Sequence, residues 1–179
     1  MRWGIRKEEF TSPEHLSSWM RNNIGYSDFT KLKSHDEVEK TKRGSCHDQV
    51  MFAYSELKKM GLNPKAEFLV EYNPKTHAGG STHSFVHYEK DGKTYWLENA
   101  WGGHEGRHAF KDLDSIKSEI TRIHNSEQTE YSKLKWGKFN PEDHTPGESL
   151  GELLNISLNQ SEVTALKHAE NWVKSYIYG

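Results

Sequence analysis

The sequence predicts an α+β fold in which an antiparallel sheet packs against a central helix. One observation is an apolar stripe at helical spacing between residues 50 and 60, with a capping pair before it and a glycine after it. Another is a pair of strand-like segments, 82–90 and 93–99. They flank Asp91-Gly92, which is the strongest short signal for a β-hairpin.

A single domain is expected for the 179 residues, because two cores would be cramped at this length. We expect a core over residues 14–110 and a C-terminal helical extension over 111–179. The 24 basic and 26 acidic residues are balanced, so charge does not support binding to nucleic acid or to an anionic membrane. One cysteine cannot form an internal disulfide. Because no signal peptide or membrane span is recognisable, we expect a cytoplasmic protein.

The first predicted element is a helix that begins after Ser12 and ends at Gly25. Pro13 stands at its first position, where proline is favoured because its missing N–H has no partner there. The polar residues 26–43 are expected to connect this helix to the next one. They include a short helix that starts from Ser34.

The next predicted helix begins at the only cysteine of the chain, Cys46. Ser45 and Asp48 form a capping-box-like pair at its start, and Gly61 stands where a left-handed C-cap is expected. Cys46 comes four residues before the first member of the apolar stripe, so the thiol is expected at the helix tip, on the inward side. The stripe consists of Val50, Ala53, Leu57 and Met60.

Three predicted strands follow, at residues 66–72, 82–90 and 93–99. The two-residue turn between the last two sets a register in which His87 pairs with Trp96.

This register brings two polar side chains to one face of the hairpin. His83 and Glu98 are diagonal neighbours, roughly 7–8 Å apart. Asn99 points to the opposite face and is therefore the weaker partner for His83.

Beyond the hairpin, a loop rich in glycine and histidine covers residues 102–108, and a helix is expected around 112–124. Residues 125–151 are polar and contain two prolines and several glycines, so an irregular, mobile stretch is expected. A last helix is predicted over residues 159–177, where an apolar stripe follows a capping pair.

The combination of Cys46, His83 and Glu98 predicts a thiolate nucleophile. A helix N-terminus favours the thiolate and lowers the pKa of a cysteine. His83 would act as base towards the thiol and then as acid towards a leaving amine, while Glu98 holds the imidazole. The backbone N–H of Cys46 would form part of an oxyanion hole. A lone cysteine or a strand histidine is usually structural, and the three roles together carry the prediction.

Three further residues are candidates for substrate binding. Trp101 follows the acidic residue and is expected to line the cleft. His47 is expected at the cleft rim, because on a helix it points about 100° away from Cys46. Trp19 is the third candidate.

No metal or other cofactor is expected. His83 and His87 lie about 13 Å apart on a strand, which is too far to share one ion. His104 and His108 have the same spacing in a loop and remain candidate ligands, but no paired ligand motif accompanies them.

The part of the chain that contains Cys46 and the hairpin also resembles the transglutaminase-like superfamily. R-G-S-C-H-D-Q-V resembles its Gly-x-Cys segment, and H-S-F-V-H-Y-E-K-D-G-K-T-Y-W-L-E-N-A-W resembles its histidine strand, turn and Asp-Pro-x-Trp ending. S-W-M-R-N-N-I-G-Y resembles the preceding helix. The resemblance covers about residues 14–101 and implies a papain-like layout. It also implies that Cys46, His83 and Glu98 are nucleophile, base and third member.

Two positions depart from the family pattern. Glu98 stands where aspartate is usual, and Asn99 replaces a proline. Papain-like enzymes use asparagine to orient histidine, so Asn99 stays a second candidate for that role.

We therefore expect cysteine-dependent acyl transfer on protein or peptide amides through a thioester. Either water or an amine would resolve the thioester. The small core favours hydrolysis, because an amine substrate needs a second binding channel. A non-catalytic peptide-binding module with the same fold is the alternative, and a metal-dependent protein is third. Oligomeric state does not follow from the sequence.

Overall fold

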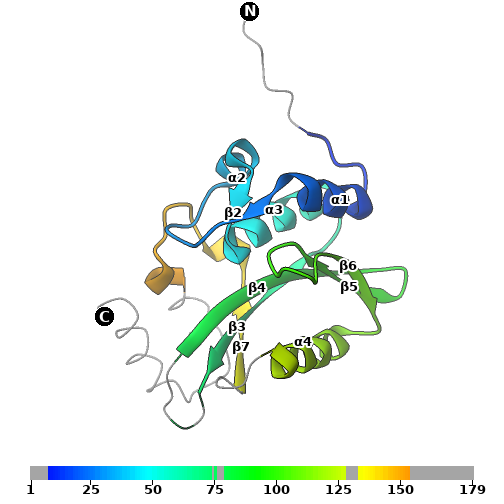
Figure 1. Ribbon diagram of the computed structural model, residues 1–179. Helices are drawn as coiled ribbons and strands as arrows, with labels where there is room; N and C mark the ends of the chain where they lie inside the picture. Colours follow the sequence, from blue (N-terminus) through cyan, green and yellow to red (C-terminus); the bar gives the residue numbers. More distant parts are fainter. Residues whose placement is uncertain (1–7, 74, 76–78, 128–132, 154–179) are drawn as a thin grey trace, which may run out of the picture.

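A computed structural model describes residues 8–73, 75, 79–127 and 133–153. The helices are α1 (Pro13–Asn23), α2 (His35–Thr41), α3 (Cys46–Lys59) and α4 (Leu113–Glu127), with a short helical turn η1 (Pro141–Asp143). The strands are β1 (Gly25–Tyr26), β2 (Arg43–Gly44), β3 (Lys65–Tyr72), β4 (Gly79–Lys90), β5 (Lys93–Glu98), β6 (Gly106–Phe110) and β7 (Lys133–Phe139). In Figure 1 the sheet separates α4 from α1, α2 and α3, which confirms a mixed α+β fold.

Five strands form the main sheet, in the order β6-β5-β4-β3-β7, and every neighbouring pair is antiparallel. The predicted hairpin is confirmed, with His87 paired to Trp96. Its turn residues Asp91 and Gly92 have φ values of 51° and 72°. Positive φ at both positions is typical of the tight turn whose twist matches that of the strands.

The sheet carries an apolar layer on each face because successive strand residues point to opposite sides. On the α3 side, Phe68 and Val86 belong to a buried cluster that includes Phe52 of α3. On the α4 side, Leu69 and Phe85 pack with the apolar stripe of α4. The predicted packing of the sheet on α3 is therefore confirmed, and α4 adds a second helical layer.

The helix starts agree with the capping residues read from the sequence. Ser12, Ser34 and Ser45 are the N-caps of α1, α2 and α3, and the last two form complete capping boxes. Gly61 follows α3 with a φ of 77°, as a left-handed cap requires. Among the described residues, no helix is long and apolar enough to cross a membrane.

Two predictions of irregular structure were wrong. Residues 133–139, expected to be irregular and mobile, form β7, which pairs with β3. Part of the expected loop 102–108 belongs to β6, which pairs with β5. Both are edge strands of the sheet. Edge strands are often short and rich in lysine, which protects them from pairing with other chains.

The composition of β7 explains why its pattern was hidden. Lysine occupies three of its seven positions. Its apolar residues are divided between the two faces of the sheet, with Leu134 and Trp136 on the α4 side and Phe139 on the α3 side. The segment 111–179 thus supplies α4 and β7 to the core and is not purely a helical extension. The helix predicted over residues 159–177 lies outside the described residues.

Candidate active site

The tip of α3 is held in place by the buried carboxylate of Asp48. One carboxylate oxygen, Oδ2, accepts hydrogen bonds from the backbone N–H and the hydroxyl of Ser45, at 2.8 and 2.9 Å. The other, Oδ1, accepts the backbone N–H of Lys33 at 2.8 Å. Asp48 is therefore a cap, as predicted, and it also fixes the preceding loop against the start of α3.

Cys46 is the first residue of α3 and is buried, with 6% of its surface exposed. Its Sγ lies 3.9 Å from the backbone carbonyl oxygen of Thr82 in β4. At this level β4 pairs with β3, His83 being opposite Leu69. The pairing of β4 with β5 begins only at Val86. Cys46 therefore lies beside the part of β4 that β5 does not cover.

His83 bonds to Glu98, as the hairpin register predicted. The distance from His83 Nε2 to Glu98 Oε2 is 2.8 Å, and both side chains are largely buried. Because Nε2 is engaged, the ring nitrogen left for Cys46 is Nδ1. The charges of the thiolate and the imidazolium each contribute to the pKa of the other group.

The Glu98 carboxylate is fixed by the turn of the chain that follows β5. Its Oε1 accepts three successive backbone N–H groups, from Asn99, Ala100 and Trp101, at 2.8 to 3.0 Å. Its Oε2 also accepts the indole N–H of Trp96 at 3.3 Å. A buried carboxylate with this many donors is rigid and stays ionised.

The site favours an ion pair between thiolate and imidazolium. Burial opposes ionisation of the thiol. Positive charge and hydrogen bonds from His47 and His83 outweigh burial and lower the pKa of Cys46 from 9.0 to about 5. Burial likewise opposes the imidazolium, but the charge of Glu98 and the bonds to Cys46 and Glu98 raise the pKa of His83 to about 10. The pKa of Glu98 is lowered, because the charge of His83 and its hydrogen bonds exceed the effect of burial.

Glu98, not Asn99, is the residue that orients His83. The side-chain amide of Asn99 donates to the carbonyl oxygen of Ile24 at 3.2 Å and to Oε1 of Gln49 at 2.6 Å. Asn99 therefore ties the end of β5 to α1 and α3, on the side of the sheet away from the imidazole. The choice that the sequence left open is settled by these contacts.

A cleft of about 240 Å³ opens in front of Cys46 and His83. It lies on the α4 side of the sheet, and the last turns of α4 form one of its walls. Among its lining residues are Tyr26, Cys46, Leu69, Glu71, His83, Trp101, Ile120, His124, Glu127 and Leu134.

Trp101 lines this cleft, where the sequence placed it. Its ring is 5.4 Å from the ring of His83, in an edge-on arrangement. The indole N–H donates to Oε2 of Glu127 at 3.3 Å, and Glu127 is the last residue of α4. Trp101 therefore joins the turn that holds Glu98 to the wall of the cleft.

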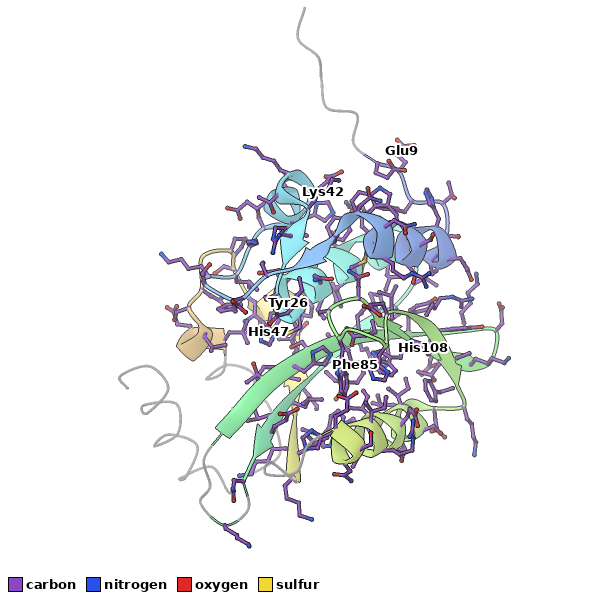
Figure 2. All side chains as sticks on the ribbon, viewed as in Figure 1. Glu9, Tyr26, Lys42, His47, Phe85 and His108 are labelled. Carbon is purple, nitrogen blue, oxygen red and sulfur yellow. The ribbon has the colours of Figure 1, made fainter. Side chains whose placement is uncertain are left out.

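His47 does not lie at the cleft rim, contrary to the prediction. It is 1% exposed, and its ring stacks on Phe68 on the α3 side of the sheet. Its Nδ1 is 2.7 Å from the hydroxyl of Ser84, and its Nε2 is 3.2 Å from that of Thr82. Figure 2 shows His47 on the α3 side of β4 and Phe85 on the α4 side. His47 thus anchors α3 to the two residues that flank His83.

Trp19 is also placed differently from the prediction. Its ring stacks on Phe52 with centroids 5.7 Å apart, and the ammonium of Lys42 lies 4.1 Å above it. It packs against the core of the α3 side and is not among the cleft-lining residues of the described chain.

Several residues of the cleft were not anticipated. Tyr26 comes from the segment that was read as a connection, yet β1 pairs with β2 directly before Cys46 and brings Tyr26 to the cleft. His124 and Glu71 bond across 53 positions of sequence. No local pattern signals such a contact, because it depends on the docking of α4 on the sheet.

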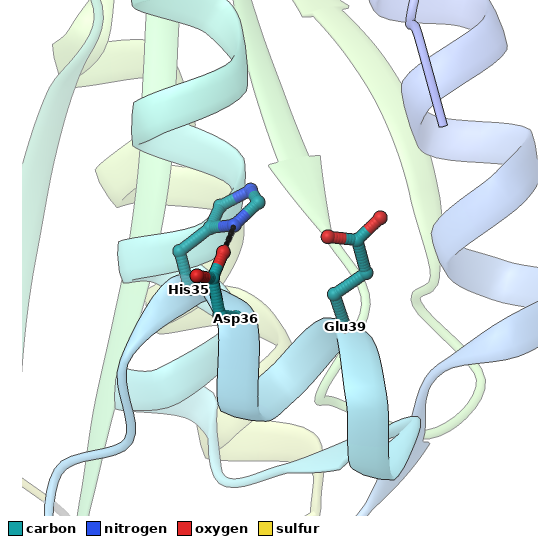
Figure 3. A group of neighbouring side chains, drawn as sticks. All are labelled: His35, Asp36 and Glu39. Atoms are coloured by element: carbon teal, nitrogen blue, oxygen red, sulfur yellow. Dashed lines mark hydrogen bonds and ion pairs between the residues drawn. The ribbon is translucent and has the colours of Figure 1, made fainter. Parts of the chain in front are cut away.

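One group in the described part of the chain could bring three metal-binding atoms within 4.8 Å of one another: His35, Asp36 and Glu39 of α2 (Figure 3). The ring nitrogens of His35 already contact Asp36 and Glu56. Figure 3 shows the three side chains on one side of α2, and the ring of His35 stacks on Phe52 of α3. We assign no metal to this group, since exposed acidic clusters are common without one.

The two loop histidines considered as ligands have other contacts. His104 Nε2 lies 3.1 Å from Oε1 of Glu127. His108 Nε2 donates to the carbonyl oxygen of His104 at 2.8 Å. The first contact connects the loop before β6 to α4, and the second holds the loop together, so a structural role accounts for these histidines.

The fold and site together define an α+β protein in which a cysteine and a histidine line one cleft and a buried glutamate bonds to the histidine. No protein-family model matches the chain, and no curated protein matches it significantly. The functional assignment therefore depends on the geometry of the site.

Proposed function

We propose that this chain is a cysteine-dependent acyl-transfer enzyme, similar in layout to transglutaminase-like hydrolases. Its substrates are protein or peptide amides, and the reaction proceeds through a thioester on Cys46. The observation that carries this proposal is the position of His83. Its Nε2 is bonded to Glu98, its pKa is raised by the charges of Glu98 and Cys46, and it lines the same cleft as Cys46.

In the first half-reaction the Cys46 thiolate attacks the carbonyl carbon of the amide. A C–S bond forms, and the carbonyl oxygen becomes an oxyanion next to the N-terminus of α3. The N–H groups of a first helical turn lack intrahelical acceptors, so the N–H of Cys46 can donate to this oxyanion. His83 gives its proton to the amide nitrogen, the C–N bond breaks and the amine leaves.

The second half-reaction begins with His83 neutral and the acyl group on Cys46. The imidazole takes a proton from the acceptor, water or an amine, as the acceptor attacks the thioester carbon. The new C–O or C–N bond forms, and the C–S bond breaks. Thiolate and imidazolium are thereby restored, with Glu98 again stabilising the cation. We propose water as the ordinary acceptor.

The size of the cleft favours a side chain or a short stretch of backbone as the bound part of the substrate. Its volume of about 240 Å³ is below the roughly 300–1,000 Å³ of pockets that enclose a drug-sized ligand. Trp101 and Tyr26 offer aromatic surfaces beside the thiol. A glutamine side chain, with its terminal amide presented to Cys46, fits these features.

The experiment that tests this function is capture of the thioester. The protein is incubated with glutamine-containing peptides and hydroxylamine, which converts a thioester to a hydroxamate and frees the thiol. Mass spectrometry of the peptide should show the hydroxamate with the wild-type protein and none with Cys46→Ser. If the wild type forms no hydroxamate and no acyl adduct on any peptide or peptide bond tested, the chain is a peptide-binding module and not an enzyme.

A further inference from the structure

His124 and Glu71 form a second bonded pair in the cleft, separate from the pair His83 and Glu98. His124 is 1% exposed, and its Nδ1 lies 3.1 Å from Oε1 of Glu71. The two residues come from α4 and β3 and line the same cleft as Cys46. The acyl-transfer steps do not use them.

The other ring nitrogen of His124 has no hydrogen-bond partner. Within the described residues, five buried side-chain atoms are in this condition, and Nε2 of His124 is the only one from a residue that lines the 240 Å³ cleft. A buried polar atom without a partner is costly, by about 1–3 kcal/mol, and such atoms in native structures often mark a ligand or a function.

The bond to Glu71 decides what Nε2 can do. A carboxylate accepts, so Nδ1 carries the proton that it donates to Glu71. Nε2 accepts from a ligand when the imidazole is neutral and donates to one when it is protonated. A cationic ligand selects the neutral form, because it would repel the imidazolium. The ligand also meets negative charge, because Glu71 and Glu127 both line the cleft, whereas none of its described lining residues is Lys or Arg.

We propose that His124 and Glu71 form a subsite for an alkylammonium group of the substrate. In a peptide, this group is a lysine side chain close to the amide that Cys46 attacks. The ammonium donates to Nε2 of His124 and is attracted by the carboxylates, while Leu69, Ile120 and Leu134 contact its methylene chain. This assignment of the substrate rests on the proposed function, but the subsite itself can be tested without turnover.

The first test compares two ligands on the wild-type protein. Two acetylated, amidated glutamine peptides differ only in a residue next to the glutamine, which is lysine in one and norleucine in the other. Each is used to slow the alkylation of Cys46 by iodoacetamide. The lysine peptide should protect Cys46 at a concentration about fivefold lower, as expected for one partly solvated ion pair. Equal protection by the two peptides would overturn the proposal.

A pair of matched variants then locates the effect. Glu71→Gln removes a carboxylate of the cleft, and Glu119→Gln makes the same change on α4 at Glu119, whose carboxylate pairs with Arg122. The preference for lysine should fall in the first variant and persist in the second. If both variants lose it equally, the preference comes from net charge and the subsite is rejected.

A measurement on Cys46→Ser protects the test against a folding defect in these variants. In the proton NMR spectrum, the Hε1 signal of His124 is assigned by its loss in His124→Gln. This signal should shift when the lysine peptide is added and stay in place when the norleucine peptide is added. Butylammonium is the third ligand. A shift with butylammonium but not with the lysine peptide would overturn the assignment to the acyl substrate, whereas a shift with the peptide supports it.

The two proposals fail in different ways. Absence of hydroxamate, with preference for lysine retained, rejects the enzyme and keeps the cationic subsite. Formation of hydroxamate from lysine and norleucine peptides at equal rates, with equal protection of Cys46, keeps the enzyme and rejects the subsite.

Discussion

Nε2 of His83 lies 2.8 Å from Oε2 of Glu98, which joins the middle strand of the sheet to the end of its neighbour. The bond fixes which ring nitrogen of His83 is free, because a bond made by one nitrogen sets the tautomer and orientation of the other. The free nitrogen, Nδ1, is available to Cys46. Four further donors hold the carboxylate of Glu98. The backbone turn after β5 therefore fixes the position of the imidazole.

The first prediction concerns the pH dependence of Cys46 alkylation. The pKa of Cys46 is lowered to about 5 and that of His83 is raised to about 10, so the ion pair exists between these two pH values. The rate with iodoacetamide should be near its plateau by pH 7 and fall as the pH drops through 5. In His83→Ala the inflection should move towards the unperturbed value of 9.0. An inflection near 9.0 in the wild type would contradict the site.

The same shifts predict how the ion pair affects stability. The lowered pKa of Cys46 stabilises the folded state. This stabilisation is complete above pH 9.0, the pKa of the thiol in the unfolded chain, and is lost as the pH falls through about 5. The raised pKa of His83 also stabilises the folded state. This stabilisation is complete below pH 6.5, the pKa of the imidazole in the unfolded chain, and is lost as the pH rises through about 10. Urea unfolding of wild type and Cys46→Ser across this range should therefore differ most between pH 5 and 10.

Glu98→Gln should reduce the reactivity of Cys46 while the fold is kept. Glutamine can accept from His83 but carries no charge, so the pKa of His83 falls and that of Cys46 rises. Each unit by which the Cys46 pKa exceeds the assay pH lowers the thiolate fraction about tenfold. We expect at least a tenfold loss in alkylation rate at pH 6. Asn99→Ala is the control, and an equal loss there would mean that Asn99 shares the orienting role.

His47→Ala should destabilise the protein by about 2–4 kcal/mol, because it leaves a cavity beside Phe68 and removes the partners of two hydroxyls. Those hydroxyls belong to Thr82 and Ser84 on either side of His83. Urea denaturation measures the loss. His15→Ala, at a half-exposed histidine of α1, should cost much less. Similar losses in the two variants would show that His47 is not an anchor.

The two capping boxes provide a comparison between a buried and an exposed cap. Asp48→Ala removes three hydrogen bonds made by a buried carboxylate and should cost roughly 2–3 kcal/mol. Glu37→Ala removes the equivalent box at Ser34, which is exposed, and should have a smaller effect. Midpoints of thermal unfolding can rank the two variants. A larger shift for Glu37→Ala would contradict the assigned role of Asp48.

The parts of the fold that were predicted correctly depend on short-range rules. The start of α3 follows from Ser45 and Asp48, three residues apart, and the hairpin register follows from a two-residue turn. Once that register is set, His83 and Glu98 must be neighbours on one face. Local chemistry thus determined the thiol at a helix tip and the imidazole–carboxylate pair.

The errors arose where packing across the chain decides the structure. His47 was assigned to the rim because its direction was compared only with Cys46, whereas the hydroxyls of β4 and the ring of Phe68 hold it in the core. The strands β6 and β7 have weak patterns of their own, because as edge strands they need only one partner.

The sequence by itself determined that a thiol stands at a helix tip and that an imidazole and a carboxylate are neighbours, since these follow from a cap, a turn and a strand period. Only the tertiary structure decided what faces them. The cleft exists because α4 packs on the second face of the sheet, and the bond between His124 and Glu71 joins residues 53 positions apart. Contacts of that separation depend on how apolar surfaces fit together, and no spacing in the sequence encodes them.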